Sequence, residues 1–209
     1  MPIQNQLSYS LGLKTQEGNK ALAKSIADSE NASQVLELVQ FIDSKPQKRL
    51  QMDAVLTLAY VSERNPEMMK RHIDFLLLKL CDPINRVVYG SMIALAHVAY
   101  LVVDQLFQDL SKVLDAMGVG TVVTKDHGFR ILVTLYKREE YTDDLFYIIL
   151  EQLVLAPANQ LGQYTERMIP VILPNHKEKF IETLEGLRDG LTNEYHLKRM
   201  TKHLKKLYK

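Results

Sequence analysis

The feature that most constrains the fold of this chain is an internal repeat. The segment 56–61, Leu-Thr-Leu-Ala-Tyr-Val, is matched 37 residues later by Ile-Ala-Leu-Ala-His-Val at 93–98, and 132–136 is a third copy. A turn and a second amphipathic segment follow each copy, and such segments begin near residues 32, 67, 103, 142 and 175. This period is typical of stacked helix pairs, which bury their apolar faces only against neighbouring pairs.

The apolar residues of the second segments are spaced as in helices, for example at Leu106, Leu110 and Val113. Strict alternation is missing, so the pattern argues against a sheet. The sequence predicts first helices over 16–28, 47–62, 84–101, 121–138 and 158–173. It predicts second helices over 32–44, 67–81, 103–117, 142–156 and 175–189, and a last helix over 193–208.

Helix-boundary residues agree with this division. Asn65-Pro66 and Asp82-Pro83 each place a capping side chain before a proline at the first helical position. Asn175 followed by Glu178 has the spacing of a capping box. The glycines at or near predicted helix ends are Gly118, Gly120, Gly162 and Gly190.

One repeat resembles the HEAT family. Asp82-Pro83-Ile84-Asn85-Arg86-Val87, leading to Ala94-Leu95, is similar to the Asp, Val-Arg and Ala-Leu pattern of a HEAT first helix, although Arg86 precedes Val87. Pro170 would kink the helix over 158–173, as prolines in HEAT first helices often do. The resemblance implies an all-α fold, a right-handed α-α superhelix (solenoid) of about five HEAT-like helix pairs with a C-terminal capping helix. We expect a partly ordered N-terminal extension over 1–15 and one repeat domain over 16–209.

Composition narrows the function classes. The 26 basic and 25 acidic residues nearly cancel, so no global field attracts nucleic acid or a membrane surface. Cys81 is the only cysteine, which excludes an internal disulfide, fits a reducing compartment and suggests a buried thiol. No secretory signal or membrane span is evident, and we therefore expect a cytoplasmic protein.

The HEAT resemblance implies that second helices line a concave binding face. The segment 142–156 carries three acidic residues and no basic one, and 103–117 carries three acidic residues and one basic one. We expect this acidic strip to bind a basic peptide or protein, with Tyr147 as an aromatic anchor. The alternative is an ordinary solvated helix face. The candidate residues are Asp104, Gln108, Asp115, Asp143, Asp144, Tyr147, Glu151, Glu182 and Glu185.

The last predicted helix has the clearest charge bias. It could bind phosphates or an anionic surface, or it could be a solubilising cap over the final repeat. Deletion of residues 193–209 should destabilise the fold if the helix is a cap. The candidate anion-binding residues are Lys198, Arg199, Lys202, Lys205 and Lys206.

Chemistry-bearing motifs are scarce. The six histidines lack metal-ligand spacing, and no phosphate loop, nucleophile elbow or paired cysteine is present, so we expect no metal, no cofactor and no enzymatic activity. Some alkylpurine DNA glycosylases have HEAT-like repeats, but they use basic faces with tryptophans, and this chain has no Trp. The sequence predicts a non-enzymatic interaction scaffold or adaptor. Nucleic-acid binding through the last helix and, less favoured, base processing are the alternatives.

Overall fold

The chain is described by a computed structural model over residues 1–208, which contain α and 3₁₀ helices and no strand. The helices belong to two compact units: unit 1 is Met1–Gly128, and unit 2 begins at Phe129 and includes the rest of the described chain. The prediction of one repeat domain over 16–209 stays a prediction. No helix of the described residues is long and apolar enough to cross a membrane.

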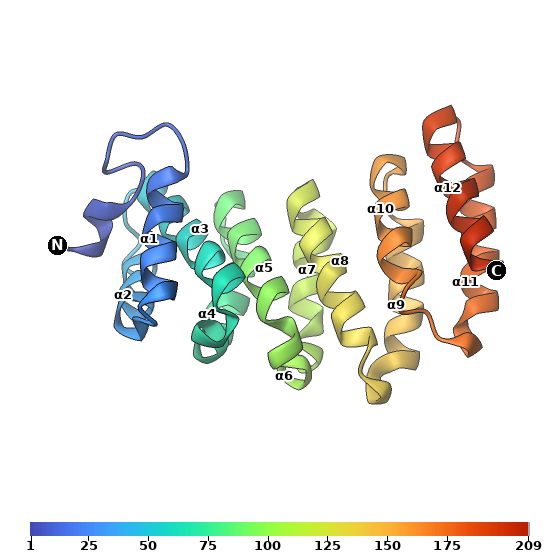
Figure 1. Cartoon of the computed structure of the whole chain (residues 1–209), viewed down its shortest axis with the longest axis horizontal. Helices are drawn as coiled ribbons and strands as arrows, with labels where there is room; N and C mark the ends of the chain where they lie inside the picture. Colours follow the sequence, from blue (N-terminus) through green and yellow to red (C-terminus); the bar gives the residue numbers. More distant parts are fainter. Residues whose placement is uncertain (209) are drawn as a thin grey trace. The chain divides into compact units, whose positions relative to one another are not determined.

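Unit 1 is built from successive helix pairs (Figure 1). Its first helices are α1 (Glu17–Asp28), α3 (Lys48–Arg64) and α5 (Asn85–Val98), and α3 packs against both α1 and α5. Its second helices are α2 (Ala32–Asp43), α4 (Ile73–Leu78), α6 (Val103–Gln108) and α7 (Leu110–Val119). Helix α8 (Val122–Tyr136) begins in unit 1 and ends in unit 2.

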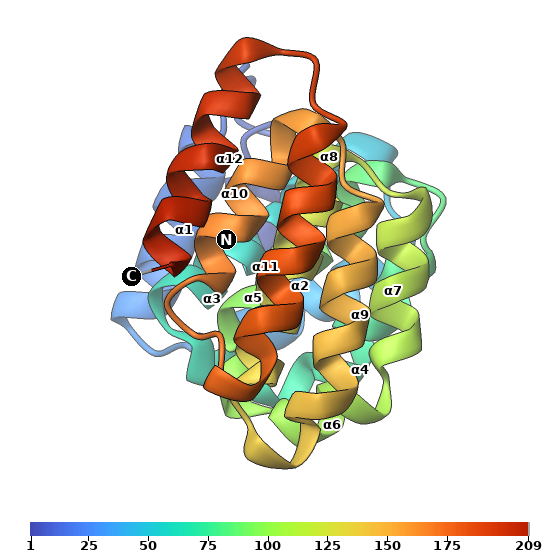
Figure 2. The same ribbon diagram turned by 90° about the vertical axis from the view of Figure 1, so that its right-hand side faces the viewer.

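Unit 2 continues the alternation with α9 (Thr142–Val154), α10 (Ala158–Met168), α11 (Pro174–Asp189) and α12 (Glu194–Leu207). Helices α9 and α11 lie side by side, and α12 packs against α10 and α11 (Figure 2). The buried stripe of α12 contains Met200, His203, Leu204 and Leu207. Helix α12 therefore covers the end of unit 2 with one face and leaves its lysine-rich face in solvent.

The predicted apolar stripes are the helix faces that are buried. In α9 the buried apolar residues are Leu145, Phe146, Ile149, Leu150 and Leu153, which recur at intervals of three and four positions along one helix face. The side chains of Val55 and Leu58 in α3 are fully buried, as are those of Met92 and Leu95 in α5. The sequence repeat thus predicts the core residues, because equivalent positions of successive helix pairs are buried in equivalent surroundings.

Two predicted second helices are not continuous. The segment 67–81 is a 3₁₀ helix (Pro66–His72), the short α4 and another 3₁₀ helix (Lys79–Cys81). The segment 103–117 divides at Asp109, whose backbone N–H bonds to Gln105 O while Lys112 N–H bonds to Asp109 O. Periodicity alone does not predict these interruptions, because a short 3₁₀ turn changes the helical spacing only slightly.

Several predicted helix boundaries are wrong. Helix α11 begins at Pro174, so Asn175 is inside the helix and forms no capping box. Helix α5 begins at Asn85 with Ile84 as its N-cap, so Pro83 lies before the helix and Asp82 is not the capping residue. Asp82 Oδ1 accepts a hydrogen bond from Ile84 N–H (2.9 Å) in the turn before the helix. Helix α10 ends at Met168, so Pro170 follows the helix and does not kink it. The reason is that residues 169–171 form a turn, and a proline suits this region better than a helix interior.

Two side-chain predictions also fail. Gly162 lies inside α10, where an added Cβ would be 2.8 Å from Arg199 Cδ, so the glycine makes room for α12. Cys81 is exposed at the end of the 3₁₀ helix Lys79–Cys81, contrary to the expected buried thiol.

The N-terminal extension packs against unit 1. It contains a 3₁₀ helix (Ile3–Gln6), and Ile3 and Leu7 are fully buried. Ser8 N–H donates to Asn19 Oδ1 (2.8 Å), and Asn19 N–H donates to Ser8 Oγ (3.1 Å). Ile3 and Leu7 therefore belong to the core of unit 1, whereas residues 9–15 are exposed.

Candidate functional site

The candidate acidic surface in unit 2 begins on α9. Asp144, Tyr147 and Glu151 are three and four positions apart and all are exposed, and 66% of Tyr147 is accessible. Neither Asp144 nor Glu151 forms an ion pair within the described residues. The Tyr147 ring packs edge-on against buried Phe146, with ring centroids 5.5 Å apart. The face of α9 thus presents a supported aromatic ring between two free carboxylates.

The neighbouring helix α11 adds more acidic groups, and some of them have partners. Glu182 accepts a hydrogen bond from Lys179 Nζ at 2.7 Å, and this bond raises the pKa of Lys179. Glu185 accepts from the Tyr208 hydroxyl at 2.7 Å, which raises the pKa of Tyr208. We call Asp143, Asp144, Tyr147, Glu151, Glu182 and Glu185 the α9–α11 face. Because Glu182 and Glu185 have hydrogen-bond partners, the net negative charge of the α9–α11 face comes mainly from α9.

An open cavity of about 500 Å³ lies along α11. The side chains that line it include Glu178, Ile181, Glu182 and Tyr208. A lysine or arginine side chain combines an apolar stem with a charged head. The lining offers Ile181 to the stem and glutamates to the head.

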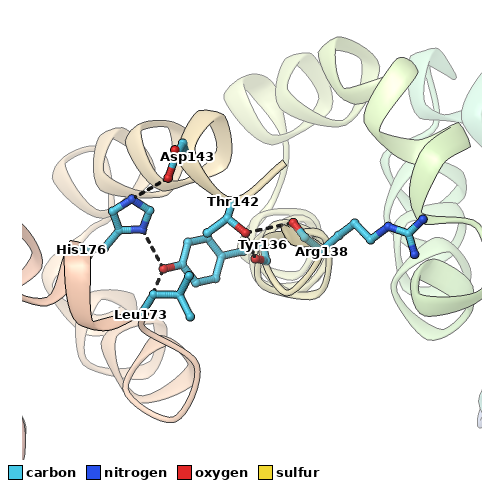
Figure 3. A network of polar contacts seen from close by, with 6 residues as sticks. All are labelled: Tyr136, Arg138, Thr142, Asp143, Leu173 and His176. Carbon is cyan, nitrogen blue, oxygen red and sulfur yellow. Dashed lines mark hydrogen bonds and ion pairs between the residues drawn. The ribbon is translucent and has the colours of Figure 1, made fainter. Parts of the chain in front are cut away.

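A polar network holds α9 and α11 together (Figure 3). His176 of α11 lies between Asp143 Oδ1, 3.0 Å from Nε2, and the Tyr136 hydroxyl, 3.0 Å from Nδ1. Leu173 N–H donates to the Tyr136 oxygen at 3.2 Å. The His176 ring is stacked on Phe146, with centroids 4.0 Å apart. Asp143 is consequently a positioning group that anchors the start of α9.

The hydrogen-bond directions in this network are consistent with one arrangement. Because the Tyr136 oxygen accepts from Leu173, its hydroxyl proton is available to Nδ1, and Nε2–H can donate to Asp143. Burial raises the pKa of Tyr136, and the nearby Asp143 adds to this effect while the Leu173 N–H opposes it. Tyr136 therefore remains a proton donor at neutral pH.

The remaining candidates of the acidic strip lie in unit 1. Asp104 and Gln108 are exposed on α6, and Asp115 is exposed on α7. Beside them, Gln105 Nε2 donates to Asp74 Oδ1 at 2.6 Å, and Lys112 pairs with Asp109 at 2.6 Å. Unit 1 thus has its own exposed acidic positions on second helices, together with a lysine, Lys112, that pairs with Asp109.

The candidate anion-binding residues on α12 differ in availability. Lys202, Lys205 and Lys206 are exposed. Lys198 pairs with Glu194 at 2.6 Å, and Arg199 donates to Glu166 of α10 at 3.0 Å. Arg199 is therefore part of the α10–α12 contact.

The structure brings together residues that the sequence kept apart. Sequence reasoning treated His176 as one of several scattered histidines, and it did not connect this residue with Tyr136 or Asp143. These side chains are separated by 40 and 33 positions, so only the stacking of helix pairs brings them together. In residues 1–208, no three His, Cys, Asp or Glu side chains are grouped as metal ligands.

Among comparisons with known proteins, only the comparison with solved structures found similar proteins. No known family model matches the sequence, and no curated protein is similar to it. A designed armadillo repeat protein, solved in complex with the peptide (KR)4, is similar with a TM-score of 0.62 and 16% identity, over 98% of this chain and 99% of that one. The crystal structure of an engineered protein is similar with a TM-score of 0.63 and 20% identity, over 99% of both chains.

The chain therefore has the fold of an all-α repeat solenoid. Its likeness to an armadillo repeat protein supports the repeat class predicted from the period. Membership in the HEAT family in particular stays a prediction.

Proposed function

We propose that the chain is a non-enzymatic scaffold or adaptor that binds a basic peptide or protein segment on its α9–α11 face. The observation that carries this proposal is the exposed Tyr147 between two carboxylates, Asp144 and Glu151, that have no ion-pair partner. A cytoplasmic location belongs to the same proposal, because the single cysteine fits a reducing compartment.

The chemistry of the face suits alternating basic residues. An arginine or lysine over the Tyr147 ring would make a cation–π contact, while its neighbours reach Asp144 and Glu151. The cavity along α11 would take a further basic side chain against Ile181 and the glutamates. The designed armadillo repeat protein in complex with (KR)4 supports the proposal, since a similar fold accommodates a basic peptide.

The test is direct binding of a fluorescein-labelled (KR)4 peptide, followed by fluorescence anisotropy at low and physiological salt. The double variant Asp144→Lys/Glu151→Lys should bind about tenfold more weakly or worse, because two attractive charges become repulsive. Tyr147→Ala should also weaken binding, by about three- to tenfold, because the cation–π contact is lost.

The matched control is Glu17→Lys/Glu67→Lys, which makes the same change in net charge at two exposed positions of unit 1. Its binding should stay within about twofold of the wild type, because neither position belongs to the α9–α11 face and exposed charges outside the binding site are screened. Equal loss of affinity in both double variants would show that net charge, and not this face, attracts the peptide.

The acidic residues of unit 1 extend the proposal. Asp104, Gln108 and Asp115 are exposed on second helices, the same elements that carry the face in unit 2. If these residues of unit 1 contact a basic partner, Asp104→Lys/Asp115→Lys should weaken its binding by about tenfold, because two attractive charges become repulsive. Unchanged binding of the partner by this variant would show that only the face in unit 2 takes part.

The second candidate function is nucleic-acid binding by α12, favoured by the exposed Lys202, Lys205 and Lys206. It predicts steeply salt-dependent binding of duplex DNA or RNA that is lost in the triple Gln variant of these lysines. For the base-processing alternative, the test is release of bases from alkylated DNA.

A further inference from the structure

The most distinctive cavity outside the acidic face lies in unit 1, beneath the N-terminal extension. It has a volume of about 600 Å³, within the range of pockets that hold small organic ligands. Its lining comes from the loop 8–16 and from the N-terminal parts of α3 and α5. The lining residues that bear on its chemistry are Tyr9, Leu13, Lys14, Arg49, Met52 and Arg86.

The wall made by the extension is fixed in place. Asp53 is 6% exposed, and its Oδ2 accepts a hydrogen bond from Tyr9 N–H at 2.8 Å. Gly12 adopts φ +70°, a conformation that favours glycine, and Leu13 N–H returns to Ser8 O at 2.9 Å. Together with the Ser8–Asn19 hydrogen bonds, these contacts hold the loop over the cavity.

The charges of the lining are unbalanced. Three basic side chains line the cavity, and the only acidic one, Asp53, already binds the loop backbone. None of Lys14, Arg49 and Arg86 forms an ion pair within residues 1–208. Two arginines and a lysine around one cavity repel one another unless an anion lies between them.

Both arginines have free donors. Arg49 is held by a cation–π contact with the Tyr9 ring, 5.4 Å from its centroid, so its N–H groups are not used by this contact. Arg86 donates through Nε to the Tyr89 hydroxyl at 2.6 Å, and its terminal nitrogens remain available. A guanidinium group in this state can bind an oxyanion through two parallel hydrogen bonds.

The sequence repeat explains why Arg49 and Arg86 line the same cavity. Arg49 and Arg86 are 37 residues apart, the same offset that relates the matching segments of α3 and α5. Each is the second residue of its helix, where the positive end of the helix dipole adds to the side-chain charge. Equivalent positions of two neighbouring repeats thus place two cations at one edge.

We infer that this cavity is a binding site for a small organic phosphate. The phosphoryl group lies between Arg49 and Arg86 with Lys14 nearby, and the organic part contacts Tyr9, Leu13 and Met52. The volume is too large for an inorganic anion alone, and the apolar lining gives the organic part a surface to bury. The site is independent of the proposed peptide-binding face, which is in unit 2.

The test is titration of the full chain with phenyl phosphate, using isothermal titration calorimetry for affinity and backbone amide NMR shifts for location. Shift changes should be confined to residues 8–16 and the first turns of α3 and α5. Inorganic phosphate and benzyl alcohol should each bind at least about tenfold more weakly, since each lacks one of the two parts. Phenylacetate should bind more weakly than phenyl phosphate because its anion has less charge and fewer acceptors.

Arg49→Gln and Arg86→Gln should each weaken phenyl phosphate binding by about ten- to hundredfold, as expected for a lost charged hydrogen bond. Arg71→Gln removes an exposed cation elsewhere in unit 1 and should bind like the wild type. Arg49→Lys keeps the charge and should bind with intermediate affinity, which separates the effect from misfolding. Three results would overturn the site: NMR shift changes elsewhere in the chain, no binding of phenyl phosphate, or wild-type affinity in both Arg49→Gln and Arg86→Gln. Inorganic phosphate or phenylacetate that bound as tightly as phenyl phosphate would overturn the ligand class.

Discussion

At the scale of single residues, the hydrogen-bond network around His176 should affect the stability of the fold more than any exposed charge does. One buried imidazole is shared by the Tyr136 hydroxyl and the Asp143 carboxylate, and its ring covers Phe146. Each removed partner leaves another polar group without its bond in a buried position. The network is therefore a sensitive probe of how the second helices of unit 2 are held.

Tyr136→Phe tests this network. The variant removes the hydroxyl that bonds His176 Nδ1 and accepts from Leu173 N–H, so we expect a loss of about 1–3 kcal/mol in the free energy of unfolding. Urea unfolding followed by circular dichroism measures it. Tyr147→Phe is the control, because the Tyr147 ring is 66% exposed and should change the free energy by less than about 0.5 kcal/mol. Equal stabilities of the two variants would contradict the structural role of Tyr136.

His203 gives unit 2 a pH dependence. Burial lowers its pKa below the ordinary value of 6.5, Arg199 and Lys206 lower it further, and Glu166 and the Gly162 backbone raise it. Because the folded chain binds this proton less readily than the unfolded chain, stability is full above pH 6.5 and falls as the pH drops toward the folded pKa.

The corresponding variant is His203→Met, which keeps a side chain of similar size without a titrating group. Unfolding free energies measured between about pH 7.5 and pH 5 should fall less steeply for the variant than for the wild type. His72, whose pKa burial also lowers, remains in both proteins and cancels in the comparison. Parallel pH profiles would mean that His203 is not the responsible group.

At the scale of elements, the packing of α3 against α5 depends on Gly90. A Cβ built at this position would lie 2.9 Å from Val55 Cγ1, and valine is too short and too branched to move aside cheaply. Gly90→Ala should therefore destabilise the protein by about 1–3 kcal/mol, measured by denaturant unfolding. Gly186→Ala, in an open position of α11, should stabilise by about 0.5–1 kcal/mol. A stabilised Gly90→Ala would show that α3 and α5 separate without cost.

Helix α12 can be tested as an element. Its side chains Met200, Leu204 and Leu207 are buried in unit 2, and Arg199 reaches Glu166 across Gly162. Deletion of residues 193–209 exposes the opposing surfaces of α10 and α11, so we expect the melting temperature to fall by several degrees, about 2–8 °C or more. Thermal unfolding by circular dichroism measures the change, and an unaltered melting curve would contradict the cap hypothesis.

At the scale of the whole molecule, periodicity predicted the order and approximate extent of the helix pairs. It succeeded because stripes such as Leu145, Ile149 and Leu153 are set by local spacing and burial. It failed where neighbours decide the detail: the 3₁₀ segments around α4, the division at Asp109 and the position of Gly162 all depend on what packs beside them. Local sequence patterns do not predict such tertiary contacts.

The candidate sites show the same limit. Helix spacing predicted that Asp144, Tyr147 and Glu151 share one exposed face, and the structure confirms their exposure. Neither the His176 network nor the cavity under the N-terminal extension was predicted, because their members come from segments 30 to 45 positions apart or from a loop without periodicity. For Arg49 and Arg86, only the offset of 37 residues, which equals the repeat length, could have indicated from the sequence that they occupy equivalent positions.

The tie that His176 makes between α9 and α11 has a thermodynamic consequence for recognition. Helices already held at a fixed spacing lose little further motion when a ligand settles on them, so the entropy cost of association falls mainly on the incoming peptide. A flexible basic peptide would then bind with an unfavourable entropy that a cyclised version of the same sequence largely avoids, which makes ring closure of the ligand a route to tighter complexes.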